Sequence, residues 1–213
     1  MEMKQNNNFF IFFILYTLNF SAAIFSKEIL NVEELIYKSY MEQLSDEQIK
    51  KFTSINSEWN TISYFILPII LFIKIYLITS LLDIGFFLFN IKINFQQIFN
   101  IVLKAEFIFL LPIILKIIWF RYFRPEYTFT DLQNFAPLSL MNFYSYNTIE
   151  PWYIYPLRAI NLFEFIYCTI IAIFVTKTTD TPNTKSFTAT ICSYSVGMTI
   201  WIVVVMFLVI NTN

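Results

Sequence analysis

The chain has 213 residues and a net charge of −1, and 57% of its residues are hydrophobic, including 26 Phe. This near-neutral charge offers no basic surface for nucleic acid, and soluble domains rarely contain so large an apolar fraction. The absence of His excludes imidazole metal sites and a histidine general base, and two Gly cannot build a phosphate-binding glycine loop. We therefore expect an all-α, polytopic membrane protein with about five transmembrane helices, a short extramembrane helical loop and no cofactor.

The first apolar run covers residues 9–25 and follows a polar Asn tract that contains Lys4. Ser21 and Ala23 stand at the −3 and −1 positions of a possible cleavage site, which is typical of a secretory signal peptide. The same run is long enough to act as a signal anchor. We predict a first transmembrane helix at about 9–25 and leave open whether it is cleavable.

Residues 26–61 form a charged, acidic segment that we predict to be an extramembrane helical loop. Asn31 with Glu34, and Ser45 with Gln48, match the sequence pattern of a helix N-terminus. Apolar residues recur at helical spacing after each of these positions, so we expect two short amphipathic helices. They either pack on the membrane domain of the same chain or dock a partner protein.

The second and third spans are predicted at 62–91 and 95–119, joined by a short polar turn. A single helix over 62–91 would be about 45 Å long, so it must tilt, kink near Pro68 or project from the bilayer. The third span carries Pro112 in its middle, and we expect a kink there.

An aromatic interfacial loop is predicted at 120–157, followed by a fourth span at 158–176 and a fifth at 187–210. Five spans place the two termini on opposite faces of one membrane domain. Because the N-terminal segment resembles a signal anchor, we expect the N-terminus in the cytoplasm and the C-terminus outside, although Lys and Arg counts alone favour the reverse. Three tryptophans at the span boundaries of one face predict an aromatic belt: Trp59, Trp119 and Trp152.

Several ionisable or amide side chains fall inside the predicted spans, where each buried charge costs roughly 2.5–3.5 kcal/mol on insertion scales. Such residues usually face the protein interior and pair with one another. The predicted intramembrane polar network consists of Lys74, Asp83, Lys104, Glu106, Asn161 and Glu164.

Helical geometry places Asp83 and Lys74 on opposite faces of one helix, so the expected ion pairs join different helices. Asp83 is a candidate partner for Lys104. The remaining candidate pairs join one acidic residue to one lysine, namely Glu106 or Glu164 with Lys74 or Lys116. The pairs either orient the helices or form a proton or ion path, and Lys116 also lies near enough to the belt to extend its amine toward the headgroups.

Small residues recur every fourth position in the fifth span, at Ala189, Ser193 and Gly197. This spacing allows two helices to approach closely. It predicts either packing within the chain or an interface with a partner.

The order of a first span, an extramembrane helical loop and a hairpin of spans with the turn KINFQQ resembles bacterial proteins of the Yip1-like family. Pro112 matches a proline in the second arm of that hairpin. The stretches LLDIGFFLF, VLKAEFIFLL, LQNFAPLSLMNF and YIYPLRAINLFE are similar to a group of small inner-membrane proteins, some of which carry the label sulfate transporter permease. The resemblance implies a multi-pass, Yip1-like architecture in the bacterial inner membrane.

The spans contain one Asp, whereas an intramembrane aspartyl protease needs two, and the chain lacks the Gly-x-Ser motif and the His of a rhomboid protease. It also lacks the Glu-Ala-Ala coupling loop of an ABC permease. We expect a non-catalytic membrane subunit or scaffold of a larger inner-membrane complex for export, envelope biogenesis or transport. The alternative is a subunit that translocates an ion or solute through its intramembrane charges. Expected partners are the lipid bilayer and other membrane proteins, which would bind loop 26–61, loop 120–157 or the last span.

Overall fold

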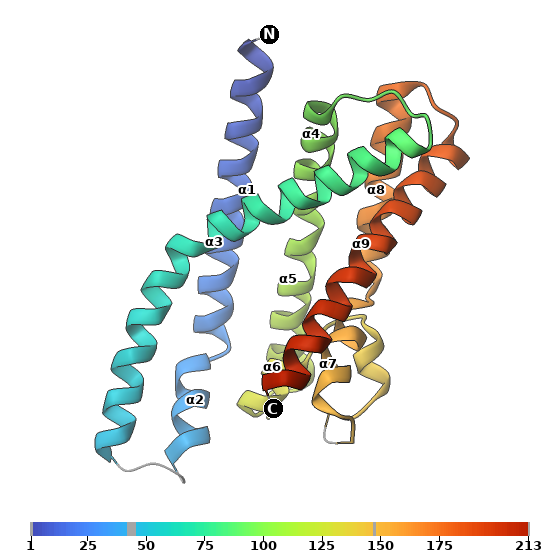
Figure 1. Ribbon diagram of the computed structural model, residues 1–213. Helices are drawn as coiled ribbons and strands as arrows, with labels where there is room; N and C mark the ends of the chain where they lie inside the picture. Colours follow the sequence, from blue (N-terminus) through green and yellow to red (C-terminus); the bar gives the residue numbers. More distant parts are fainter. Residues whose placement is uncertain (1, 42–45, 147, 213) are drawn as a thin grey trace.

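The computed structural model describes residues 2–41, 46–146 and 148–212, and the chain is all-helical within these ranges (Figure 1). The longer elements, in chain order, are α1 (Glu2–Ile29), α2 (Val32–Met41), α3 (Asp46–Leu88), α4 (Phe95–Ala105), α5 (Leu110–Ile118), α8 (Leu162–Thr179) and α9 (Asn183–Thr212). Successive long helices run in alternating directions between the two ends of the molecule. The N- and C-termini consequently lie at opposite ends, and α2 lies at the same end as the C-terminus (Figure 1).

Among the described residues, four helices are long and apolar enough to cross a membrane: Asn7–Ile29, Tyr64–Leu88, Leu162–Thr179 and Asn183–Thr212. They correspond to the first, second, fourth and fifth predicted spans. Their outward faces carry exposed Phe, Ile, Leu and Val side chains, as expected for helices surrounded by lipid. The chain is therefore compatible with a multi-pass, all-α membrane protein.

The third predicted span, 95–119, differs from the expected single helix. It is divided into α4, a 3₁₀ segment η1 (Glu106–Phe109) and α5, which together form one interrupted rod (Figure 1). Pro112 has no N–H to donate to the carbonyl of Ile108, and its ring crowds that carbonyl. The backbone just before the proline therefore forms the tighter 3₁₀ turn instead of continuing as an α-helix.

The extramembrane loop also differs from expectation, because α2 is the one separate short helix among its described residues. The second predicted amphipathic helix is the beginning of α3, which runs for 43 residues with Pro68 inside it. At 1.5 Å per residue, such a helix is about 64 Å long, roughly twice the hydrocarbon thickness. Residues 46–67 contain neither Gly nor Pro, so nothing in the sequence ends the helix before the apolar part. Figure 1 shows that α3 changes direction along its length, and Ser45 lies outside the described residues.

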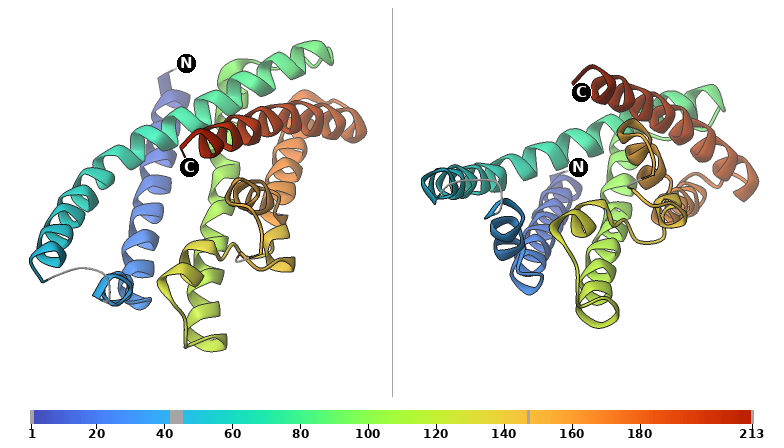
Figure 2. Two further views of the ribbon diagram at one scale, coloured as in Figure 1. Left: turned by 60° about the horizontal axis from the view of Figure 1, so that its bottom comes forward. Right: turned by 90° about the horizontal axis from the view of Figure 1, so that it is seen from below.

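The aromatic segment 120–157 folds back onto the helices of the chain. It contains η2 (Trp119–Phe123), α6 (Phe129–Asn134), η3 (Leu140–Phe143) and α7 (Pro151–Ala159). α6 packs against α2, whereas α7 packs against α9. Seen from below in Figure 2, α6 lies beside the ends of α1 and α5. The fourth span begins at Leu162 rather than 158, because Asn161 caps α8 after an extended residue.

The main core lies where α3, α4, α8 and α9 meet. Its fully buried side chains include Ile75 and Phe86 of α3, Ile98 of α4, and Ile171 of α8. α1 contributes Leu15 to the same core. This packing holds the apolar helices around a small polar cluster.

Candidate functional site

An ion pair links α3 to the interrupted third rod. The Nζ of Lys74 lies 2.8 Å from Oε2 of Glu106, the first residue of η1. The Glu106 side chain is 2% exposed and the Lys74 side chain 40% exposed. The ammonium also lies 3.9 Å from the ring centroid of Phe109, within range of a cation–π interaction. The pair Lys74–Glu106 is one of the candidate ion pairs predicted from the sequence.

Three more polar side chains from α8 and α9 complete this region. The Tyr194 hydroxyl donates a hydrogen bond to Oε2 of Glu164. Tyr167, fully buried, interacts electrostatically with both Glu106 and Glu164. We call Lys74, Glu106, Glu164, Tyr167 and Tyr194 the polar cluster. Its members come from three helices and η1, so it ties α3, α8 and α9 to the middle of the broken rod.

Two atoms of the polar cluster lack a hydrogen-bond partner among the described residues: Oε1 of Glu106 and the hydroxyl of Tyr167. The two groups are neighbours, because the Tyr167 hydroxyl interacts with the Glu106 carboxylate. The cluster also holds two carboxyl groups and one ammonium. If both carboxyl groups are ionised, the ammonium of Lys74 compensates the charge of Glu106, and the Tyr194 hydroxyl donates a hydrogen bond to Glu164.

Asp83 and Lys104 belong to the predicted network but form no ion pair with each other in the described part of the chain. Asp83 lines a groove at the α3–α4 hairpin together with Lys92 and Gln97. Lys104 is exposed in the last turn of α4, which is the end farther from that hairpin. The two side chains are thus at different levels of the helix pair.

Asn161 acts as a helix cap. Its Oδ1 accepts a hydrogen bond from the backbone N–H of Glu164 at 3.1 Å, and its Nδ2 donates to the carbonyls of Arg158 and Ala159. The amide therefore fixes the turn from α7 into α8, and this turn positions Glu164 in the first turn of α8.

The small-residue stripe of α9 faces α3. Ala189 is fully buried, and a Cβ added at Gly85 of α3 would collide with Ser193. A Cβ added at Gly197 would collide with Leu81 of α3. The stripe thus supports close helix packing inside the chain.

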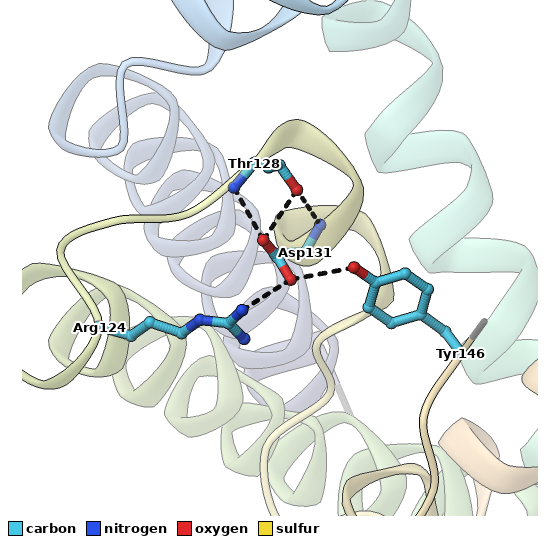
Figure 3. Close-up of polar contacts among 4 residues, drawn as sticks. All are labelled: Arg124, Thr128, Asp131 and Tyr146. Atoms are coloured by element: carbon cyan, nitrogen blue, oxygen red, sulfur yellow. Dashed lines mark hydrogen bonds and ion pairs between the residues drawn. The ribbon is translucent and has the colours of Figure 1, made fainter. Parts of the chain in front are cut away.

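A second polar cluster lies in the aromatic segment (Figure 3). Asp131 is 7% exposed, and its Oδ2 accepts hydrogen bonds from the backbone N–H and the hydroxyl of Thr128 at 2.9 and 2.8 Å. Its Oδ1 accepts from the Tyr146 hydroxyl and lies 3.1 Å from Nη2 of Arg124. Burial alone would raise the pKa of Asp131, but these hydrogen bonds and the Arg124 charge outweigh it and hold the pKa below its usual value. We call these four residues the Asp131 cluster; it ties the segment together.

Two of the three belt tryptophans are described. Trp119 is 42% exposed and stacks on Phe135, and Trp152 stacks on Tyr153. The side chain of Trp59 lies outside the described residues. Trp201 of α9 adds a contact at this end, because its Nε1 donates to the Tyr155 hydroxyl of α7 at 2.6 Å.

Sequence reasoning missed both tyrosines of the polar cluster and the Asp131 cluster. Tyr167 follows Glu164 by three residues and so shares its helix face, which is a signal that was available. Thr128 and Asp131 match a capping-box spacing, another usable signal. The hydrogen bond from Nδ2 of Asn100 to Oδ1 of Asn8, 2.6 Å long, joins residues 92 positions apart and has no local signal.

Within the described residues, no three His, Cys, Asp or Glu side chains are arranged to hold a metal ion. Comparison of the chain with protein-family models, curated proteins and solved structures found no match.

Proposed function

We propose that this chain is a non-catalytic, multi-pass subunit or scaffold of a larger inner-membrane complex that serves export, envelope biogenesis or transport. The supporting observation is how little of three of the four apolar helices is covered by the rest of the chain. In the most apolar 18-residue stretch of each helix, 6% of the residues are buried in Asn7–Ile29, 17% in Tyr64–Leu88 and 11% in Asn183–Thr212. Helices in lipid associate by packing rather than by hydrophobic burial, so these open faces suit partner helices as well as lipid.

A groove outside the apolar helices also supports the subunit role. A groove of about 590 Å³ lies between α2 and residues 124–131, and charged side chains of both signs line it. Glu34 and Lys38 come from α2, and Arg124 and Glu126 from the facing segment. This mixed charge fits a polar segment of a partner protein better than an apolar one.

The alternating helix directions support a five-span topology in which the interrupted rod α4–η1–α5 is the third span. The same directions are compatible with termini on opposite sides of a membrane, and we propose that this membrane is the bacterial inner membrane and that the chain is Yip1-like. We propose a cytoplasmic N-terminus. Reporter fusions at each terminus test this: activity of a periplasmic reporter at the C-terminus alone is the expected result, and activity at the N-terminus alone would reverse the orientation.

Purification of the full chain in a mild detergent tests the subunit role. We expect a defined set of membrane proteins to copurify at a constant ratio across detergents. Recovery of the lone chain under every mild condition, together with uptake of an ion or solute by liposomes that contain it, would contradict the subunit role.

The polar cluster favours a second candidate function, translocation of a proton or another ion. In liposomes, Glu106→Gln would then abolish ion movement without loss of folded protein, because the variant keeps the shape but not the charge of the carboxylate. Asp83→Asn is the matched control, since Asp83 lies outside the polar cluster. Equal transport by both variants would exclude a role for Glu106 in translocation.

A further inference from the structure

A groove of about 560 Å³ opens between the lower part of α1, α5 and the segment that links α6 to α7. Lys27 lies in the last turn of α1 and Lys116 in the last turn of α5, so the groove lies where two apolar helices end. Arg158 of α7 completes the set of cations that line it. We call this feature the cationic groove.

The cationic groove has an excess of positive charge. In the described part of the chain, no Asp or Glu lines it and neither Lys116 nor Arg158 forms an ion pair with a carboxylate. The two cations are both half-buried and close enough to repel each other. Lys27 differs, because its Nζ lies 2.8 Å from Glu33.

Partial burial makes the uncompensated positive charge of Lys116 and Arg158 energetically costly. Lys116 donates one hydrogen bond, 2.6 Å long, to the carbonyl of Leu132, which leaves two of its three N–H groups for another acceptor. Burial lowers the pKa of Arg158, the direction expected when a cation loses water without gaining a counterion. An anion placed between the two side chains would remove the repulsion and supply the missing acceptors.

The remaining walls of the cationic groove are apolar. Pro112 and Ile113 lie about one turn above Lys116 on α5, and Phe135 faces them from the linking segment. Trp119 stacks on Phe135 with ring centroids 5.6 Å apart, and interfacial Trp residues favour the headgroup level of a bilayer. The cations therefore lie near headgroup depth, and the apolar walls extend from them toward the hydrocarbon.

We propose that the cationic groove binds an anionic phospholipid, with the phosphate between Lys116 and Arg158 and an acyl chain along Pro112 and Ile113. This inference rests on the proposed membrane location but not on the subunit role. A free phosphate ion has the same charge chemistry, yet it would gain nothing from the apolar walls.

Native mass spectrometry of the full chain in detergent provides the test. The chain is titrated with phosphatidylglycerol, with phosphatidylcholine of the same acyl chains, and with inorganic phosphate. The test variant is Lys116→Gln/Arg158→Gln, and the charge-preserving variant is Lys116→Arg/Arg158→Lys. The matched control, Lys92→Gln/Lys177→Gln, removes two exposed lysines at the opposite end of the molecule, one in the turn between α3 and α4 and one in the last turn of α8.

We expect the wild-type chain to prefer phosphatidylglycerol and the test variant to bind it about 30-fold more weakly, from about 1 kcal/mol per cation. The charge-preserving variant and the matched control should bind it as the wild-type chain does. Unchanged binding by the test variant, or equal loss in the matched control, would overturn the site. Binding of inorganic phosphate as tightly as the lipid would overturn the lipid assignment. Circular dichroism of each variant confirms that its helices are intact before binding is compared.

Discussion

The Lys74 ammonium lies 2.8 Å from Oε2 of Glu106, and the burial of the two partners is strongly unequal. Glu106 is almost fully enclosed, whereas the Lys74 side chain is 40% exposed. The two residues belong to helices that are joined by the turn 89–94, so this ion pair closes the hairpin formed by α3 and the interrupted rod. The unequal burial predicts unequal effects of removing each partner.

Lys74→Met should destabilise the protein by about 3 kcal/mol, because it leaves a buried carboxylate without its counterion. Lys74→Met/Glu106→Gln should recover most of this loss, since neither charge remains. The thermal unfolding midpoint in detergent measures both effects. Lys104→Met serves as the control, because Lys104 is exposed and forms no ion pair among the described residues. Equal midpoints for Lys74→Met and Lys104→Met would show that the ion pair contributes nothing.

Gly85→Ala should weaken the packing of α3 on α9 by about 1–3 kcal/mol, as overpacking does elsewhere. The added methyl carbon would collide with the Ser193 hydroxyl and lie 2.5 Å from the Ser193 Cβ. Ser193→Ala should therefore not rescue Gly85→Ala, whereas Ser193→Gly should restore much of the stability. The unfolding midpoints of the single and double variants test this order, and rescue by Ser193→Ala would contradict so close a contact between the two helices.

Acidification should loosen the aromatic segment through the Asp131 cluster. The pKa of Asp131 is held below its usual value despite burial, so its ionised form stabilises the fold. This contribution is fully present above the unfolded-state pKa of about 3.9 and is lost as the pH falls through the lower folded-state pKa. The unfolding midpoint of the wild-type chain should therefore fall more steeply below about pH 4 than that of Asp131→Asn. Parallel pH profiles for the two proteins would disprove the contribution.

Asn161→Ala should destabilise the start of α8 by about 1–2 kcal/mol, because it removes the acceptor for the Glu164 N–H. Asn161→Asp keeps this acceptor and should lose less, although it loses the donor to the carbonyls of Arg158 and Ala159. Hydrogen exchange of the amides in the first turn of α8 measures the difference. Equal exchange in the two variants would contradict a capping role.

The positions of the apolar helices were predictable because each consists of a long run of apolar residues. Pro112 also predicted a disturbance in the third rod, since a residue without an N–H cannot complete the helical hydrogen bonds. The continuity of α3 was not predictable from capping patterns, because such patterns recur inside helices. A capping pattern shows where a helix can start, but it does not show that a helix already running through that position ends there.

The partners of the polar side chains were predictable only in part. Helical periodicity shows which residues share a face, so it placed Asp83 and Lys74 apart. It does not show the depth at which two helices meet, and for this reason it could not choose between Glu106 and Glu164 for Lys74. Contacts such as Asn8 with Asn100 depend on how α1 crosses α4, which no local pattern in the sequence records.

The hairpin of α3 and the interrupted rod has a consequence for how the chain enters the bilayer. In the membrane location proposed above, either arm inserted alone would carry Lys74 or Glu106 into the hydrocarbon without its partner, at roughly 2.5–3.5 kcal/mol each. Inserted together, the arms bring in a neutral pair, because Lys74 and Glu106 meet across the hairpin. The turn 89–94 keeps the two arms adjacent in the chain, so we predict that they enter the bilayer of the proposed membrane location as one unit.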